Sequence, residues 1–257
     1  MLKWLVSVDP SPNHNRALAL HEEHTGQWML RHREWEKWLD RDIRFLWIYG
    51  IPGAGKTTLL SFLIENVKSI CDQPSSQSKA WAYYYCYHAQ NHDETNHCLR
   101  WILSQLCRQL HSLPSEIRAM YQRGEQPATR DLLNALATVT RYFDTVYVLI
   151  DALDESQNRE YMATTLASLM FQERFRAIQL ITTSRDEVEI RRAFHHCSFS
   201  RISMSNELVE EDIRKYIRSR LSHDSRFARW PKSLLKDVEQ ALAKEASGMY
   251  VSSQQMP

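Results

Sequence analysis

The sequence predicts an α/β fold in which a parallel sheet is covered by helices on both faces. Five stretches have the aliphatic and aromatic composition of buried strands, at residues 46–49, 81–87, 146–150, 177–184 and 199–204. The intervening segments carry apolar residues three or four apart, as helices do. Strands that alternate with helices form βαβ units whose strands run parallel. We therefore expect a doubly wound sheet of five parallel strands.

Helical patterns also flank this core. Residues 1–42 are predicted to form an N-terminal helical segment, with helices over 14–20 and 28–39 and a break at Thr25-Gly26. The core extends over 43–206; it includes a helix along 99–110, with Asp93 or Thr95 as its N-cap, and another around 132–143. Residues 207–257 are predicted to form a C-terminal helical extension, with helices from residue 207 and over about 233–246, the latter ending at Gly248.

Composition excludes few functions. The chain has 257 residues, 43% of them hydrophobic and 25% charged, as in ordinary globular proteins. With 32 basic and 31 acidic residues the net charge is +1, which gives no support for a nucleic-acid or membrane surface. The five cysteines contain no C-x-x-C pair, and neither a signal peptide nor a long apolar stretch is evident. We therefore expect a reducing compartment, the cytoplasm.

One glycine-rich segment carries the strongest functional signal. A buried-strand pattern ends at Tyr49, then comes G-x-x-x-x-G-K-[ST], then an apolar helix. The glycines let successive N–H groups point at phosphate oxygens, and the helix adds its positive N-terminal end. The lysine reaches the β- and γ-phosphates, and the next hydroxyl binds Mg²⁺. The pattern predicts nucleoside triphosphate binding by Gly50, Pro52, Gly53, Ala54, Gly55, Lys56, Thr57 and Thr58, with Thr57 also a magnesium ligand.

Acidic residues follow the third predicted strand. Asp151 comes at its carboxyl end, where ligands of open α/β sheets bind, and is therefore predicted to hold Mg²⁺ directly or through water. Asp154 and Glu155 would then lie above the γ-phosphate, with Glu155 the better candidate for the general base. Acidic residues also stabilise the first turn of a helix by interacting with its dipole, and a helix start without any function would give the same pattern. The glycine-rich segment upstream favours the functional interpretation.

An arginine follows the fourth predicted strand. Arg185 comes directly after Thr182-Thr-Ser184, so its guanidinium could pair with phosphate oxygens. It could equally be a solvated loop residue. We include Arg185 with Asp154 and Glu155 among the candidate catalytic residues.

These three segments, in this order, resemble the NACHT family of STAND-class P-loop nucleoside triphosphatases, and most closely the NACHT modules of fungal NLR-like proteins. The resemblance is carried by residues 50–57, 149–155 and 182–185, and it extends to the pieces at 24–28 and 248–250. It covers the chain from about residue 2 to residue 250.

The resemblance implies roles for several residues. Thr25 and Gly26 would lie near the adenine or ribose, while Lys56, Thr57 and Asp151 would handle phosphate and Mg²⁺. Such modules act as signalling switches: ADP holds a closed form, exchange to ATP opens it for homo-oligomerisation through the core, and slow hydrolysis resets it. The implied strand order is 5-1-4-3-2, with the strand that ends at Ser184 between those of the phosphate loop and Asp151.

Relatives of this kind are longer. They normally have an effector domain before the module and, past the position of Gly248-Met-Tyr250, a winged-helix region and sensor repeats. The sequence given stops at Pro257. We therefore expect the parts that clamp ADP, and the effector and sensor domains, to be missing, and nucleotide binding to survive better than regulated switching.

Other functions stay open at this point. An AAA-like remodelling ATPase would need a lid arginine, which residues 214–220 could supply. A phosphotransferase is disfavoured by the paired acids, and a Ras-type GTPase by the lack of an N-K-x-D motif. A degenerate fragment that binds nucleotide without signalling is a further alternative. Because no second arginine is evident near the motifs, we expect hydrolysis to be slow.

Overall fold

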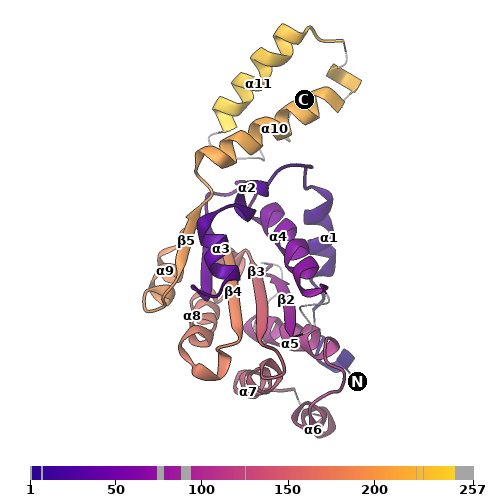
Figure 1. The fold of residues 1–257 in the computed structure, drawn as a ribbon, viewed down its shortest axis with the longest axis vertical. Coiled ribbons are helices and arrows are strands. Elements are labelled where there is room, and N and C mark those ends of the chain that lie inside the picture. The colour runs from indigo at the N-terminus through magenta and orange to yellow at the C-terminus, as the bar shows by residue number, and fades with distance from the viewer. Residues whose placement is uncertain are drawn as a thin grey trace.

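A computed structural model describes residues 2–6, 8–73, 78–87, 94–124, 126–223, 225–227 and 229–246 of the chain. Its centre is a five-stranded sheet with the order β2-β3-β4-β1-β5, in which every pairing is parallel (Figure 1). The strands are β1 (Phe45–Tyr49), β2 (Lys79–Tyr85), β3 (Thr145–Asp151), β4 (Ile178–Ser184) and β5 (Ser200–Ser203). The predicted fold class and strand order are confirmed.

Helices cover both faces of the sheet because the side chains of each strand alternate between two cores. Phe45 and Trp47 pack with one cluster, whereas Leu46 and Ile48 pack with the other. The first core is covered by α5 (Glu94–Arg108), α7 (Thr129–Thr140), α8 (Arg159–Phe171) and α9 (Val188–Phe194). The second is covered by α1 (Ser11–Ala19), α2 (Gln27–Leu30), α3 (Arg33–Leu39) and α4 (Lys56–Cys71).

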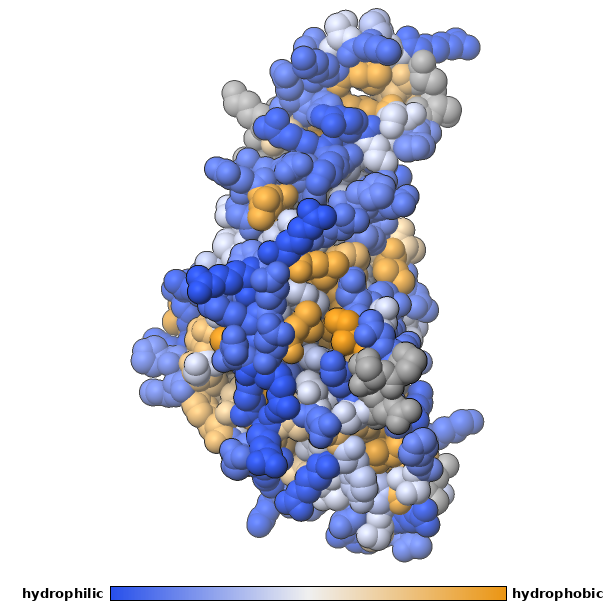
Figure 2. All heavy atoms as spheres, viewed as in Figure 1, coloured by the Kyte–Doolittle hydropathy of each residue, from blue (hydrophilic) through white to orange (hydrophobic). Residues whose placement is uncertain are grey.

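The remaining helices add further side chains to the two cores. They are α6 (Ser115–Arg123), α10 (Glu207–His223), α11 (Lys232–Ala246) and the short turns η1 (Leu2–Trp4), η3 (Leu153–Glu155), η4 (Glu173–Phe175) and η5 (Ser225–Phe227). The pair α10 and α11 extends beyond the end of the sheet at which β5 finishes (Figure 1). On the face shown in Figure 2, hydrophobic residues form separate patches among hydrophilic ones.

Element boundaries differ from the prediction in a few places. The helix expected over 28–39 is two helices, because His32 is extended and its ring accepts the N–H of Glu34, which caps α3. The apolar spacing runs on across this break, so periodicity alone could not reveal it. Thr95 lies inside α5 rather than before it. The predicted Asp93 cap and the 248–250 segment lie outside the described residues.

Two glutamines, Gln105 in α5 and Gln109 directly after its last residue, cover the outer edge of β2. The side-chain amide of Gln105 donates to the Tyr83 carbonyl at 2.8 Å and accepts from its N–H at 3.3 Å. Gln109 does the same for Trp81, at 2.7 and 3.1 Å. Backbone groups at a sheet edge otherwise offer a template for another strand. The helix therefore occupies the hydrogen-bonding positions that a further strand would use.

Replacing both glutamines should expose this edge. We expect Gln105→Ala/Gln109→Ala to lower the free energy of unfolding by about 1–3 kcal/mol, because buried backbone groups lose their partners. It should also promote association at high protein concentration. Urea unfolding and sedimentation measure the two effects. The exposed Gln122 on α6 provides the control, and a double variant that matches Gln122→Ala in both would contradict the role given to the pair.

Candidate nucleotide site

The glycine-rich loop joins β1 to α4 at the carboxyl end of the sheet. Gly53 and Gly55 have φ angles of 75° and 81°, a left-handed conformation that glycine adopts without strain. Gly50 is needed for a different reason: a Cβ there would lie 2.7 Å from the Cβ of Met204. The interpretation that all three glycines serve the curl of the loop is therefore corrected for Gly50. Ala54 is buried and Pro52 is exposed.

Lys56 starts α4 and turns back over the loop. Its ammonium donates to the carbonyls of Gly50 and Ile51 at 2.7 and 2.9 Å. Burial lowers the pKa of Lys56, and the carboxylates of Asp154 and Asp151 partly offset this shift. A cation removed from water in this way is a strong partner for an anion that enters the loop.

Asp151 ends β3, which β4 separates from β1 in the sheet, and its carboxylate is buried. Its Oδ1 accepts from the Thr183 hydroxyl at 2.6 Å, and that hydroxyl accepts the N–H of Ala152 at 2.9 Å. Burial raises the pKa of Asp151 to about 6, although hydrogen bonds from Thr183 and Thr57 act in the opposite direction. Ala152 has a φ of 53°, so the chain turns sharply after the carboxylate.

The two acids after Asp151 lie on the turn η3 and differ in their environment. Asp154 is buried; its carboxylate accepts the backbone N–H of Arg185 at 3.0 Å and the Nε of the same residue at 3.1 Å. Arg185 is therefore oriented by Asp154, and about half of its side chain remains exposed. Glu155 is half-buried and lines a cavity together with Thr57 and Asp151.

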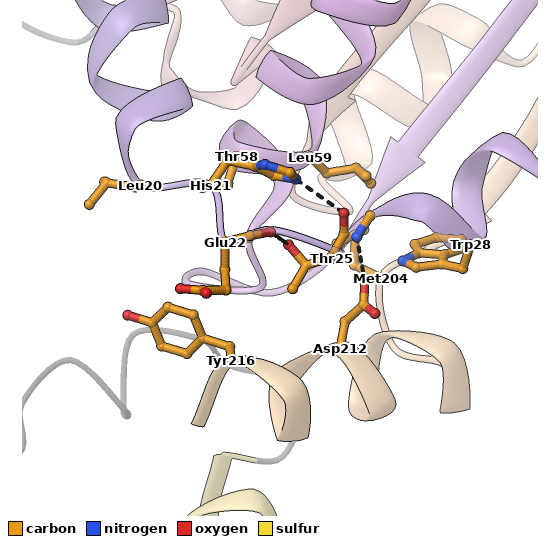
Figure 3. Close-up of a pocket in the computed structure, with 12 residues that line it drawn as sticks. Leu20, His21, Glu22, Thr25, Trp28, Thr58, Leu59, Met204, Asp212 and Tyr216 are labelled. Atoms are coloured by element: carbon orange, nitrogen blue, oxygen red, sulfur yellow. Dashed lines mark hydrogen bonds between the residues drawn. The ribbon is translucent and has the colours of Figure 1, made fainter. Parts of the chain in front are cut away.

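A pocket lies beside the start of α4, and Figure 3 shows it between the 20–28 segment and α10. Thr25 and Gly26 line it with Gly55, Thr58 and Leu59, and side chains of α10 close the opposite side. This arrangement brings the predicted base-binding residues next to the phosphate loop. The cavity of Asp151 shares Leu20 and Thr58 with this pocket, so the two are adjacent.

The Gly26 turn is tied to α10. Its N–H donates to the buried carboxylate of Asp212 (Figure 3). The same carboxylate also accepts from Lys215 at 3.1 Å. Gly26 has a φ of 75°, and a Cβ there would lie 3.1 Å from a ring carbon of Phe62. In the sequence pattern, Asp212 is only one of several acidic residues near the start of a predicted helix. The sequence pattern could not reveal that Asp212 accepts a hydrogen bond from Gly26.

The oxygen ligands at this site fit a small hard cation. Thr57 supplies a hydroxyl and Asp151 a carboxylate beside it. Mg²⁺ is usually held by one or two protein oxygens, with phosphates and waters completing its shell. No group of three or more His, Cys, Asp or Glu side chains suited to a metal occurs in the part of the chain that the structure describes. The site therefore suits Mg²⁺ bound together with a nucleotide.

Comparison with known proteins identifies the family. The family described as nephrocystin 3, N-terminal, matches residues 24–185, which is more than half of the chain. The chain belongs to this family. The match begins just before Thr25 and ends at Arg185, so it includes the glycine-rich loop and the acids after β3.

A fungal relative supports the same relation. The vegetative incompatibility protein HET-E-1 of Podospora anserina is 27% identical over 139 residues, a match that covers 50% of this chain and 10% of that protein. The chain thus corresponds to a small part of this relative. Together with the family match, it confirms the relation to NACHT modules of STAND-class nucleoside triphosphatases.

Solved structures show the same fold at low sequence identity. The ORC2 protein of Aeropyrum pernix in its ADP form has a TM-score of 0.52 and 18% identity over 85% of this chain and 58% of its own. A Walker-type ATPase of Pyrococcus abyssi has a TM-score of 0.51 and 11% identity, covering 92% of this chain and 71% of its own.

Among the helices that the structure describes, none is long and apolar enough to cross a lipid bilayer.

Asp151 makes the nucleotide-free fold sensitive to pH. The pKa of Asp151 in the folded state is about 6 rather than 3.8, so ionisation of this carboxyl lowers the free energy of unfolding. The loss is absent below pH 3.8 and reaches its full size above about pH 6. Asp151→Asn removes the cost, so we expect a gain of about 1–3 kcal/mol at about pH 7.5 that shrinks near pH 4.5.

Urea unfolding at the two pH values measures this effect. Asp237→Asn on the exposed side of α11 serves as the control, with no expected change. An Asp151→Asn variant that is less stable than the parent at both pH values would show that the carboxylate stabilises the fold.

Proposed function

We propose that the chain is a nucleotide-binding module that takes ATP or ADP with Mg²⁺, hydrolyses ATP slowly and acts as a signalling switch. The observation that carries this proposal is the joint placement of the glycine-rich loop, Lys56, Thr57 and Asp151 at one edge of a parallel sheet. Each supplies what a triphosphate with its metal needs: N–H groups, a cation and oxygen ligands.

In this proposal the chain's own residues divide the work. The loop and Lys56 bind the phosphates, and the adjacent pocket of Thr25 and Gly26 holds the base and ribose. Glu155, which lines the cavity of Asp151, orients and deprotonates the attacking water. Arg185, held by Asp154, pairs with the terminal phosphate. The bound metal would neutralise charge on the phosphates.

The switch role rests on the family relation and on the contact between Gly26 and Asp212. Because α10 touches the same turn that lines the base pocket, occupancy of the pocket can bias the position of the C-terminal helices. We assign residues 1–42, 43–206 and 207–257 as the N-terminal segment, core and extension of this module, and assembly to the core. The five cysteines are free thiols, which suits the cytoplasm.

The alternative of a remodelling ATPase gains no support from the arginines of α10. Arg218 pairs with Glu239 of α11 at 2.7 Å, and Arg220 donates to the Tyr216 hydroxyl at 3.2 Å. Within the described residues, neither arginine lines the cavity of Asp151 and Glu155.

Lys56 provides the first test of nucleotide binding. Lys56→Ala should weaken ATP binding about 10- to 100-fold, because the phosphates lose a charge-assisted hydrogen bond. Calorimetry with ATP and Mg²⁺ measures this, with the exposed Lys236→Ala as the control. If Lys56→Ala binds ATP as tightly as the parent does, the assignment of the phosphate loop is wrong.

Glu155 provides the test of hydrolysis. We expect the parent to turn over far below the enzyme median of ~10 s⁻¹. Glu155→Gln should reduce this at least about 100-fold while ATP stays bound, since the water loses its base. Phosphate release under single-turnover conditions is the measurement, and the exposed Glu160→Gln is the control. Parental turnover by Glu155→Gln would exclude this residue as the base.

A further inference from the structure

Helix α1 is fixed against the core by a buried histidine. His14 contacts the Tyr85 hydroxyl at 3.0 Å through Nδ1 and the Glu65 carboxylate at 2.7 Å through Nε2. Tyr85 ends β2, while Glu65 lies on α4, which also begins at the phosphate loop. The helix is therefore held rigidly to two elements that end or begin at the candidate site.

One face of α1 lines the cavity of Asp151 and Glu155. The face consists of Asn13, Arg16 and Ala17, with Leu20 at the C-cap; their three- and four-residue spacing places them on one side of the helix. Arg16 is its only charged member, and it is exposed. The family match starts at residue 24, so neither it nor the motifs assign a role to this arginine.

The other cations near this cavity already have partners. Lys56 donates to two loop carbonyls, and Arg185 is paired with Asp154. In the part of the chain that the structure describes, the Arg16 guanidinium makes neither a hydrogen bond nor an ion pair. It borders a cavity that holds the carboxylates of Asp151 and Glu155 and the Thr57 hydroxyl. An unpaired guanidinium at the magnesium side of a phosphate loop can accept an anion at little cost of rearrangement.

We propose that Arg16 contacts the terminal phosphate of a bound nucleoside triphosphate and thereby lets the site distinguish a triphosphate from a diphosphate. The inference rests on the proposed nucleotide binding and adds a residue from outside the three motifs. The cavity of Arg16 lies beyond Thr58 from the pocket of Thr25 and Gly26, which is where the far end of the phosphate chain has to lie. Through this contact α1 responds to the presence of the γ-phosphate, because only a triphosphate is long enough to reach the Arg16 guanidinium.

The test compares two ligands on matched variants. Calorimetry with a non-hydrolysable ATP analogue and with ADP, both with Mg²⁺, is carried out on the parent, Arg16→Ala, Arg16→Lys and two controls. The controls are Asn15→Ala, an exposed neighbour on α1 outside the cavity, and Arg33→Ala, which removes an equal charge from the start of α3.

We expect Arg16→Ala to bind the ATP analogue at least about tenfold more weakly while its ADP affinity changes less than about twofold. Arg16→Lys should recover part of the difference, since it keeps the charge but not the fork of donors. Both controls should match the parent. Circular dichroism establishes that each variant is folded, and Arg16→Gln replaces Arg16→Ala if the alanine variant is not.

Two outcomes overturn the inference. If Arg16→Ala loses affinity equally for both ligands, the arginine only balances the charge of the nearby acids. If it loses affinity for neither, the side chain does not reach the phosphates. Failure of the parent to bind either ligand would instead overturn the proposed function, so the two failures are distinguishable.

Discussion

The site depends on one buried carboxylate at the end of a central strand. Asp151 lies in β3, and the strand beside it, β4, contributes the threonine whose hydroxyl both donates to that carboxylate and accepts the next backbone N–H. A lone ionised carboxylate in such a place is costly, and burial moves its pKa upward. The neighbouring strand and the start of α4 therefore act together, since they supply the hydroxyls that make an acid at this position tolerable. A cation bound beside it would lower the cost further.

The sheet order could be predicted because three segments together resemble one family, and that resemblance implies the order in which their strands lie. The turn of the glycine-rich loop could be predicted as well, because the conformational freedom of Gly53 and Gly55 is local to a few consecutive positions. Phosphate binding by Lys56 stays a prediction. Contacts between distant segments were beyond prediction from the sequence. The hydrogen bond between Gly26 and Asp212 joins residues 186 positions apart. The ion pair between Arg185 and Asp154 orients the guanidinium and occupies the carboxylate, which the sequence pattern could not reveal. Arg16 carries no local signature, because an arginine in a short amphipathic helix is ordinarily a solvated residue.

Segments from before and after the core in the sequence meet beside the candidate site. Residues that precede the phosphate loop supply the Gly26 turn and α1, and residues that follow the sheet supply α10. The candidate base pocket is thus built from both flanks rather than from the core alone. Under the proposed function, the relative position of the flanking helices is therefore part of the ligand-binding equilibrium. The ion pair between Arg218 and Glu239 joins α10 to α11 at 2.7 Å and so helps to hold these helices together.

The glutamines that cover the edge of β2 also require the residue spacing of the helix to match that of the strand. Gln105 and Gln109 are four residues apart, a rise of about 6 Å along a helix. The residues that they pair with, Tyr83 and Trp81, are two apart, which is about 6.6 Å along a strand. These two distances match only if α5 runs antiparallel to β2 and both pairs of residues keep their spacing. A single residue inserted between the glutamines would turn the second amide about 100° around the helix, away from the strand. An insertion or deletion between 105 and 109 would therefore break the match, whatever residue types it involved.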